Sequence, residues 1–302
     1  MQDPWSLYWH SDCLDSCVVT KSKDDSLAIA AFWEQLATWL DDGAEVLDLA
    51  TGNGTVPAAL LNANNSLQVT GVDRASIDPL RFLSEPGVLS KARFQANVDI
   101  CDLPFEDASY DAVTSQFGLE YAPLEQAIPE ALRVATLGGR IQLVMHHTDS
   151  DIVVPARLKR HEMDSLLAEG GVVPTLRAFL DGDQSSEELE AAGQAHVSSD
   201  ARRTAPVSGQ IFEGVNRVIT SAGKGDMRAA NELCDGMTMR LGADRDRLRQ
   251  LDNAAMDEQR FQEIVKMIED GGARTDVATT IRSSNKAGDD HLIGWQYSGA
   301  KS

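Results

Sequence analysis

Long apolar runs and basic charge are both scarce in this sequence of 302 residues. No apolar segment approaches the roughly 18 to 20 residues that a membrane-spanning helix requires, and residues 1–10 lack the basic-then-apolar order of a signal peptide. We therefore expect no membrane span and a cytoplasmic location. Only 27 lysines and arginines oppose 47 aspartates and glutamates, and a net charge of −20 repels phosphate backbones, so we expect no nucleic-acid partner.

Cysteine is scarce as well. The four cysteines are Cys13, Cys17, Cys101 and Cys234. They are too few and too scattered for a disulfide framework in a chain of this length, so we expect reduced thiols. Cys13 and Cys17 lie four residues apart, close to His10 and Asp12, which is a spacing that a metal site can use. Because no second pair of ligands recurs elsewhere, we expect no bound metal.

The first half of the chain alternates between strand-like and helix-like patterns. Apolar residues at helical spacing predict helices, and short apolar runs that end in turn residues predict strands. The predicted helices are 24–40, 56–62 and 123–135, and the predicted strands are 45–50, 67–72, 93–96, 110–115 and 140–145. This alternation is typical of an α/β protein with a doubly wound, mostly parallel sheet.

The second half is largely helical and ends in strands. Residues 151–242 have helical patterns separated by glycine-containing turns, a long helix is predicted at 243–270, and residues 275–282 and 291–298 resemble a hairpin. We therefore predict a seven-stranded sheet with a C-terminal β-hairpin and a helical insertion after the fifth strand. The predicted segments are an N-terminal arm or lid (1–23), a Rossmann-like core (24–150), the insertion (151–242), and a long helix and hairpin that complete the sheet (243–302).

The strongest local signal is a glycine turn after the first predicted strand. Residues 45–55 read Glu-Val-Leu-Asp-Leu-Ala-Thr-Gly-Asn-Gly-Thr, and Gly52 and Gly54 let backbone approach a ligand closely. A dinucleotide fingerprint requires a third glycine where this chain has Pro57. A nicotinamide-dependent oxidoreductase therefore remains only an alternative, and the turn suits a cofactor that has no pyrophosphate.

An acidic residue ends the second predicted strand. Asp73 lies about twenty residues after the glycine turn, where a carboxylate can accept hydrogen bonds from both ribose hydroxyls of a nucleoside. A surface aspartate at a strand end is the simpler interpretation of such a residue alone. Its position after the glycine turn favours the ligand-binding interpretation.

Two further segments complete a family resemblance. Residues 96–105 read Ala-Asn-Val-Asp-Ile-Cys-Asp-Leu-Pro-Phe, and residues 109–113 read Ser-Tyr-Asp-Ala-Val. With the first motif Asp-Leu-Ala-Thr-Gly, the order and spacing resemble the class I S-adenosylmethionine-dependent methyltransferases, particularly the quinone-biosynthesis-like small-molecule methyltransferases. The resemblance covers residues 27–147 well and 257–299 loosely. It implies S-adenosyl-L-methionine as cofactor, S-adenosyl-L-homocysteine as product, and methyl transfer to an O, N or C atom of a small-molecule acceptor.

The resemblance also implies roles for individual residues. The residue matching Asp48 supports the turn and the methionine end of the cofactor, the one matching Asp99 accepts from the adenine amino group, and the next amide, of Ile100, reaches a ring nitrogen. Gln116 and Phe117 match the turn that contacts the methionine part. Many relatives have histidine at the position of Glu120, so a base role does not transfer to it. The predicted cofactor-binding residues are Asp48, Ala50, Thr51, Gly52, Asn53, Gly54, Asp73, Arg74, Asp99, Ile100, Gln116 and Phe117.

The acceptor side is less legible. His146 and His147 follow the fifth predicted strand at the edge where α/β sheets bind ligands, so either is a candidate base, although a solvated loop histidine is as compatible with the sequence. The aromatic arm Trp5, Tyr8, Trp9 and His10 closes over the cofactor or packs as a hydrophobic anchor. The insertion supplies an acceptor pocket, or it completes the core or a homodimer interface. A non-catalytic nucleoside-binding protein of the same fold is a further alternative.

Overall fold

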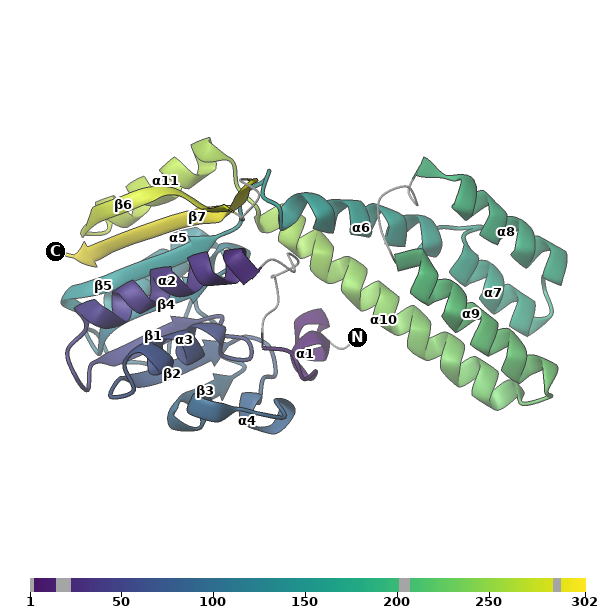
Figure 1. The fold of residues 1–302 in the computed structure, drawn as a ribbon, viewed down its shortest axis with the longest axis horizontal. Helices are drawn as coiled ribbons and strands as arrows, with labels where there is room; N and C mark the ends of the chain where they lie inside the picture. Colours follow the sequence, from purple (N-terminus) through teal and green to yellow (C-terminus); the bar gives the residue numbers. More distant parts are fainter. Residues whose placement is uncertain (1–2, 15–22, 201–206, 285–288) are drawn as a thin grey trace. The chain divides into compact units, whose positions relative to one another are not determined.

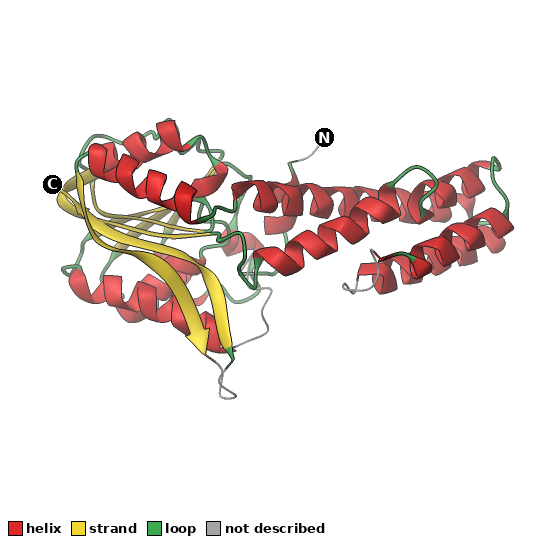
Figure 2. Cartoon of the chain, turned by 90° about the horizontal axis from the view of Figure 1, so that it is seen from above, coloured by secondary structure: helices red, strands yellow, loops and turns green. Residues whose placement is uncertain are grey.

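A computed structural model describes residues 3–14, 23–200, 207–284 and 289–302, and it divides the chain into two units. Unit 1 comprises Met1–Val153 and Asn253–Ser302, and unit 2 comprises Val154–Asp252. Within these ranges, all the strands lie in unit 1 and unit 2 is helical (Figure 2). No helix in the described ranges combines the length and the apolar character needed to cross a membrane.

The sheet of unit 1 has seven strands in the order β3-β2-β1-β4-β5-β7-β6. The strands are β1 (Glu45–Leu49), β2 (Gln68–Asp73), β3 (Arg93–Ala96), β4 (Tyr110–Gln116), β5 (Ala135–Met145), β6 (Ala273–Ser284) and β7 (Asp290–Lys301). The first five are parallel, while β7 pairs antiparallel with both β5 and β6. The predicted doubly wound sheet with a terminal hairpin is therefore confirmed.

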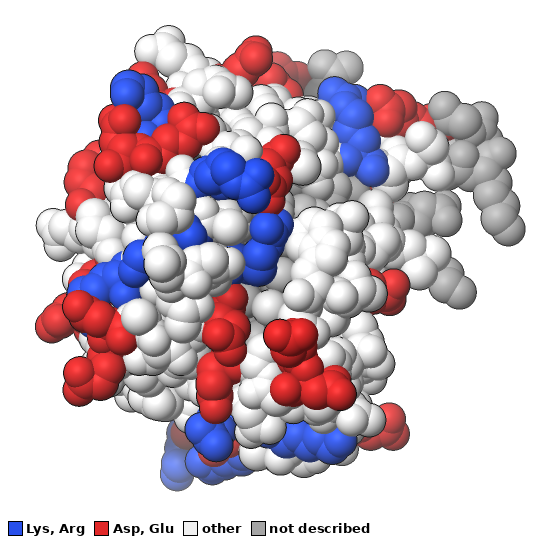
Figure 3. Space-filling view, turned by 90° about the vertical axis from the view of Figure 1, so that its left-hand side faces the viewer, with Lys and Arg blue, Asp and Glu red and all other residues white. Residues whose placement is uncertain are grey.

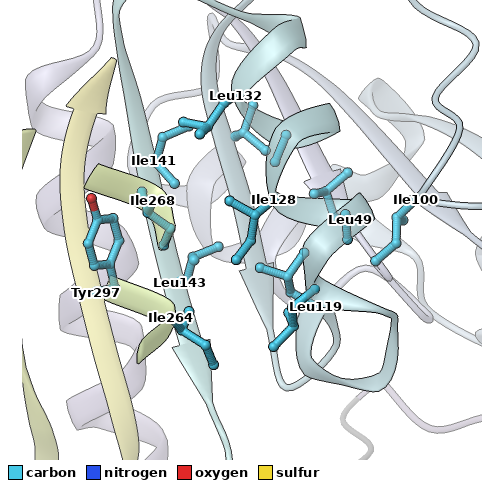
Figure 4. Packing of buried hydrophobic residues seen from close by; sticks show 14 of the residues in the cluster. Leu49, Ile100, Leu119, Ile128, Leu132, Ile141, Leu143, Ile264, Ile268 and Tyr297 are labelled. Atoms are coloured by element: carbon cyan, nitrogen blue, oxygen red, sulfur yellow. The ribbon is translucent and has the colours of Figure 1, made fainter. Parts of the chain in front are cut away.

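Helices cover both faces of this sheet (Figure 1, Figure 2). The principal helices of unit 1 are α2 (Lys23–Trp39), α3 (Thr55–Ala63), α5 (Leu124–Val134) and α11 (Glu258–Asp270). On one face, apolar residues of α5 and α11 pack against β5 and β7 (Figure 4). Ile128, Ile264 and Ile268 belong to that buried cluster with Leu143 and Tyr297. The central strands are buried almost continuously because both faces of the sheet are covered, and apolar residues at helical spacing on the helices complete this core.

Short elements complete unit 1 around the sheet edge. They are α1 (Pro4–Trp9), α4 (Pro79–Phe82), η1 (Gly87–Lys91) and η2 (Leu119–Tyr121). Pro4 occupies the first turn of α1, where a missing N–H costs nothing, and the Asp3 side chain caps that helix by accepting from the Ser6 backbone N–H. On the face of the molecule seen in Figure 3, acidic and basic side chains are interspersed.

Unit 2 consists of helices with recognisable ends. They are most of α6 (Val153–Leu167), then α7 (Val172–Asp181), α8 (Ser186–Ser198), α9 (Val207–Gly223) and most of α10 (Met227–Ala254). Gly182 ends α7 in the left-handed conformation, and Ser185 with Glu188 forms a capping box at α8. Inside the unit, the buried Ser208 hydroxyl donates to Glu162, and His196 Nε2 lies 2.9 Å from the same hydroxyl.

Three expected boundaries were wrong. The long helix predicted to begin at residue 243 begins at Met227, the start of α10. The helix predicted at 243–270 is two helices, because α10 ends at Ala254 and α11 begins after Asp257, whose side chain accepts from the Arg260 N–H as an N-cap. The intervening Met256 forms a bridge with His147 instead of continuing the helix. The fifth strand begins at Ala135, not at residue 140, because residues 136–139 form a bulge opposite β4.

Candidate functional site

The carboxyl ends of β1, β3 and β4 share an unusual backbone conformation. Ala50, Asn97 and Phe117 each follow one of these strands directly, and they have φ values of 53°, 60° and 53°. Left-handed non-glycine residues are strained and tend to cluster at functional sites. Ala50 and Phe117 were both predicted as cofactor-binding residues. A Cβ atom on Gly118 would lie 2.5 Å from that of Ala50, so the turns after β1 and β4 are packed directly together.

The glycine turn is fastened to the end of β2. Gly52 has a φ of 54°, and its N–H donates to Asp73 Oδ2 over 2.8 Å. The N–H of Ala75 donates to the other oxygen of the same carboxylate, also over 2.8 Å. Asp73 is buried, and burial raises its pKa to about 6 against these two hydrogen bonds. The structure therefore brings together the glycine turn and the acid that the sequence placed at the ribose.

The remaining turn residues support the same geometry. Asp48 is fully buried in β1 and accepts from the Thr114 hydroxyl over 2.8 Å, and burial raises the pKa of Asp48 to about 7. The Thr51 side chain packs on Gly71 so closely that β2 has no room for a Cβ atom there. Gly54 has a φ of 92° and forms the N-terminal boundary of α3, so the first amides of α3 begin at this turn.

Asn53 ties the N-terminal arm to the turn. Its amide nitrogen lies 3.1, 3.3 and 2.7 Å from the carbonyl oxygens of Trp9, Ser11 and Cys13. The opposite atom, Oδ1 of Asn53, is buried and has no hydrogen-bond partner within the described ranges. A buried polar atom without a partner is costly, and a ligand that donates a hydrogen bond would satisfy it.

The arm itself lies over the predicted cofactor residues. The Trp9 ring contacts Gly52 so closely that a Cβ atom on that glycine would lie 2.3 Å from it. Trp9 packs with Ala75 and Ile77, which follow Asp73 along the chain. Trp5 meets Tyr121 edge to face at 5.3 Å. Contacts of α1 therefore extend from the end of β2 to the turn after β4, and the remaining residues predicted for this arm, 1–2 and 15–22, lie outside the described ranges.

The predicted adenine-side residues lie in the loop after β3. Asp99 is exposed, and its Oδ1 accepts from the Cys101 N–H over 2.9 Å. Ile100 points into the core of unit 1 and therefore offers only its backbone to a ligand. The Arg74 side chain is exposed next to Asp73.

At the end of β4, the predicted pair Gln116 and Phe117 contacts two different elements. Gln116 Oε1 accepts from the Trp33 indole N–H of α2 over 2.6 Å. Phe117 is buried and stacks on His146, with ring centroids 4.4 Å apart. The interaction of Gln116 with Trp33 joins α2 to this turn.

A polar cluster occupies the space beside this turn, and we call Glu120, Tyr121 and His146 the acceptor-side cluster. His146 is completely buried, and its Nε2 lies 3.2 Å from the Tyr121 hydroxyl. Burial lowers the pKa of His146 to about 3, so its imidazole is neutral at physiological pH. Glu120 is also buried, and its Oε1 accepts from the His146 N–H over 2.8 Å.

His147, the second predicted histidine, lies outside this cluster. Its ring stacks on Trp295 at 4.5 Å, and its Nδ1 accepts from the Asp149 N–H. Neighbouring residues of an extended chain point to opposite faces, so the two histidines cannot serve one site. Burial lowers the pKa of the His147 ring as well.

The cysteine-based metal hypothesis falls partly outside the structure, because Cys17 is not among the described residues. Cys13 lies 3.6 Å from the Tyr8 hydroxyl. Within the ranges that the structure describes, no three His, Cys, Asp or Glu side chains are grouped as metal ligands.

Sequence reasoning did not select Glu120, Tyr121 or Trp33. The order of the chain carried a signal for the first two, because both follow Gln116 and Phe117 directly and so lie at the carboxyl edge. Trp33 carried no such signal, since a tryptophan on the buried face of an amphipathic helix is ordinarily a core residue.

Comparisons with known proteins agree with this geometry. A family model described as a methyltransferase domain matches residues 46–139. The ubiquinone/menaquinone biosynthesis C-methyltransferase UbiE of Bartonella quintana is 30% identical over 205 residues, which cover 57% of this chain and 74% of that protein. A demethylmenaquinone methyltransferase of Clavibacter sepedonicus is 32% identical over 148 residues, covering 48% of this chain and 56% of the relative.

Solved structures give lower identities. An S-adenosylmethionine-dependent methyltransferase from Methanosarcina mazei has a TM-score of 0.45 and 16% identity, with 88% of this chain and 96% of that one covered. A geranyl diphosphate C-methyltransferase from Streptomyces coelicolor has a TM-score of 0.36 and 17% identity, with 47% of this chain and 63% of that one covered.

Proposed function

Because this chain belongs to the class I S-adenosylmethionine-dependent methyltransferases, we propose that its carboxyl-edge site holds S-adenosylmethionine and that the acceptor-side cluster receives a small molecule. The enzyme transfers the cofactor's methyl group to that molecule. The observation that carries the site assignment is the hydrogen bond between Gly52 and Asp73, which unites the glycine turn with the ribose acid. When bound, the cofactor supplies an electrophilic methyl group on a positively charged sulfur.

The residues at this edge fit such a cofactor. In this proposal, Asp73 accepts from the ribose hydroxyls, Asp99 and the Ile100 amide bind adenine, and Gln116 and Phe117 border the methionine part. Asn53 contributes its buried, unpartnered Oδ1 to the same site. The turn lacks the third glycine of a dinucleotide fingerprint because Pro57 lies in the first turn of α3, which disfavours the nicotinamide alternative.

The acceptor-side residues shape the second half of the site. His146 is neutral and stacks on Phe117. In this proposal its ring borders the acceptor site, and its Nε2 is a hydrogen-bond partner of Tyr121. Positioning and exclusion of water supply much of the acceleration in a methyl transfer. The role of base that the sequence suggested for His146 is weakened by its low pKa, and His147 has no place in this proposal.

We propose that the acceptor is a small molecule related to the quinone precursors for which the relatives are named, and that it is methylated at carbon. We also propose that the enzyme is cytoplasmic. We propose that it binds no nucleic acid, because a net charge of −20 repels phosphate backbones. We further propose that residues 1–23 form a lid over the cofactor, and that the helical insertion bounds the acceptor. A homodimer interface remains the alternative role for that insertion.

Calorimetry with S-adenosylmethionine, S-adenosylhomocysteine and NAD tests the cofactor assignment. We expect the first two to bind and NAD not to bind. Radiolabelled S-adenosylmethionine is then incubated with naphthohydroquinone, catechol and acetylacetone, and label in the extracted product identifies the acceptor class. Binding of NAD alone would overturn the assignment, and cofactor binding without transfer to any compound would favour the non-catalytic alternative.

A further inference from the structure

Glu120 is a buried carboxylate whose second oxygen has no partner among the described residues. The residue is 7% exposed, its Oε1 accepts from the His146 N–H, and its Oε2 is buried without a hydrogen bond to any residue that the structure describes. Desolvating a carboxylate is costly unless its oxygens are hydrogen-bonded or paired with a cation. A buried group of this kind calls for an explanation, and a ligand that completes its hydrogen bonding supplies one.

The position of Glu120 indicates which ligand that is. It lies in η2, three residues after Phe117, and Tyr121 and His146 flank it. These neighbours belong to the acceptor side of the proposed site, whereas Asp73 and Asn53 belong to the cofactor side. A group that donates a hydrogen bond from the acceptor would satisfy Oε2.

We propose that Glu120 is the proton acceptor of the reaction, taking the proton that the acceptor molecule loses when it is methylated. This proposal rests on the proposed function of the site. As the acceptor atom forms its bond to the methyl carbon, the carbon–sulfur bond breaks with its electron pair left on sulfur. The acceptor's proton passes to Oε2 of Glu120 and afterwards to solvent, so charge and atoms balance.

The burial of Glu120 gives its carboxyl group a pKa suited to accepting a proton. Burial raises its pKa to about 7, although nearby backbone N–H groups, that of His146 among them, oppose that effect. A base is most effective when its pKa lies near the working pH.

Within the described part of the chain Glu120 makes no ion pair, and its titratable neighbours are Tyr121 and the neutral His146. The charged groups on the adjoining α5 and β5 have other partners: Glu125 with Arg260, Glu130 with Arg133, and Arg140 with Asp276.

The test compares the full-length protein with Glu120→Gln and with Glu125→Gln, a control that alters an exposed carboxylate on the following helix. We expect Glu120→Gln to bind S-adenosylhomocysteine as the wild type does. Its kcat with naphthohydroquinone should fall about 100-fold, at the lower end of what a general base contributes, with a smaller change in KM. The wild-type kcat should decline below about pH 7, and this decline should be absent in the variant.

A second measurement does not depend on turnover. In protein labelled with carbon-13 at glutamate carboxyls, one resonance should titrate near pH 7 and should disappear in Glu120→Gln but not in Glu125→Gln. Unchanged kcat in Glu120→Gln, titration of Glu120 in the ordinary range, or an equal loss of cofactor affinity would each overturn the proposal. A wild type that methylates only dimethyl sulfide, which releases no proton, would overturn it as well. Failure to bind S-adenosylhomocysteine would instead contradict the proposed function.

Discussion

Among the described residues, burial raises the pKa of three carboxyl groups, and all three lie at or near the carboxyl edge of the sheet. They are Asp48, Asp73 and Glu120. A raised carboxyl pKa means that the folded state favours the protonated form relative to the unfolded state. The stability linked to each group is therefore fully present below its ordinary pKa and is lost as pH rises through the folded-state pKa. Ionisation of these three carboxyl groups therefore lowers the free energy of unfolding as the pH rises toward neutral.

Asp48→Asn should reveal this cost. The pKa of Asp48 is raised to about 7, so the wild type loses stability as pH rises from about 4 to about 7, and asparagine removes that loss while still accepting from Thr114. We expect the variant to have a higher Tm than the wild type at pH 8 and a similar Tm near pH 4. Thermal unfolding at both pH values, with exposed Asp102→Asn as control, checks this. A lower Tm for Asp48→Asn at pH 8 would contradict it.

Asp73→Ala should weaken cofactor binding by about 1.5 to 3 kcal/mol, the scale of a lost hydrogen bond to a charged group. The variant also releases the N–H of Gly52, so the glycine turn loses its attachment to β2. Calorimetry with S-adenosylhomocysteine measures the effect, and Asp78→Ala, an exposed aspartate on the same loop, is the control. Unchanged affinity in a variant with native circular dichroism would remove Asp73 from the site.

The sequence predicted Asp73 but not Glu120 for a physical reason. Asp73 is identified by its distance from a glycine turn, which is a local pattern along the chain. The significance of Glu120 depends on burial and on the missing partner of one oxygen, and these arise only when β4 and β5 are assembled side by side. Residue type and spacing cannot specify either property.

At the scale of elements, the N-terminal arm is the feature with the clearest functional consequence. Trp9 contacts Gly52, and the backbone of the arm is held by Asn53. If the arm is a lid, its contacts must break before a product leaves the site. If the arm is only a hydrophobic anchor, its loss lowers the stability of the protein and leaves the rate of product dissociation unchanged.

We expect Trp9→Ala to accelerate dissociation of S-adenosylhomocysteine about tenfold, corresponding to about 1.4 kcal/mol of lost contact energy across the lid. Stopped-flow displacement measures this rate. Trp39→Ala is the matched control, because Trp39 is an exposed tryptophan of α2 that packs under Arg140. Equal dissociation rates in the wild type and Trp9→Ala would leave the arm as a hydrophobic anchor.

Most strands and the first helices could be predicted because each has a local pattern of apolar residues bounded by turn residues. The division between α10 and α11 could not, even though Asp257 is an ordinary N-cap residue. Apolar positions continue at helical spacing across the break, so periodicity favours one helix. Hydrogen bonds of Met256 with His146 and Thr148 decide otherwise, and these join segments more than a hundred residues apart in the chain.

At the scale of the whole molecule, the chain separates into a sheet unit and a helical unit. All the cofactor-binding residues that the sequence predicted, from Asp48 to Phe117, belong to the sheet unit. Within the helical unit, buried hydrogen bonds among Glu162, His196 and Ser208 connect α6, α8 and α9. These bonds stabilise the packing of the three helices within that unit.

Replacing residues 154–252 by a short Gly/Ser linker should separate cofactor binding from turnover. We expect affinity for S-adenosylhomocysteine to remain within about threefold of the wild type, while methyl transfer to naphthohydroquinone is lost, because a bare methyl donor cannot orient an acceptor. Calorimetry and the label assay measure the two effects. A truncated protein that methylates at the full-length rate would contradict a substrate role for the insertion, and an insoluble one would favour the core or homodimer alternative.

The segments that lead into and out of the helical unit are hydrogen-bonded to each other. Met256 N–H donates to His146, and Thr148 N–H donates to Met256, so the chain returns to the point from which it departed. An inserted loop with its ends pinned together adds little further closure entropy as it lengthens. The helical unit can therefore be added or exchanged between residues 153 and 253 without any change in the strand order of the sheet, and we expect such an exchange to leave the predicted cofactor-binding residues intact.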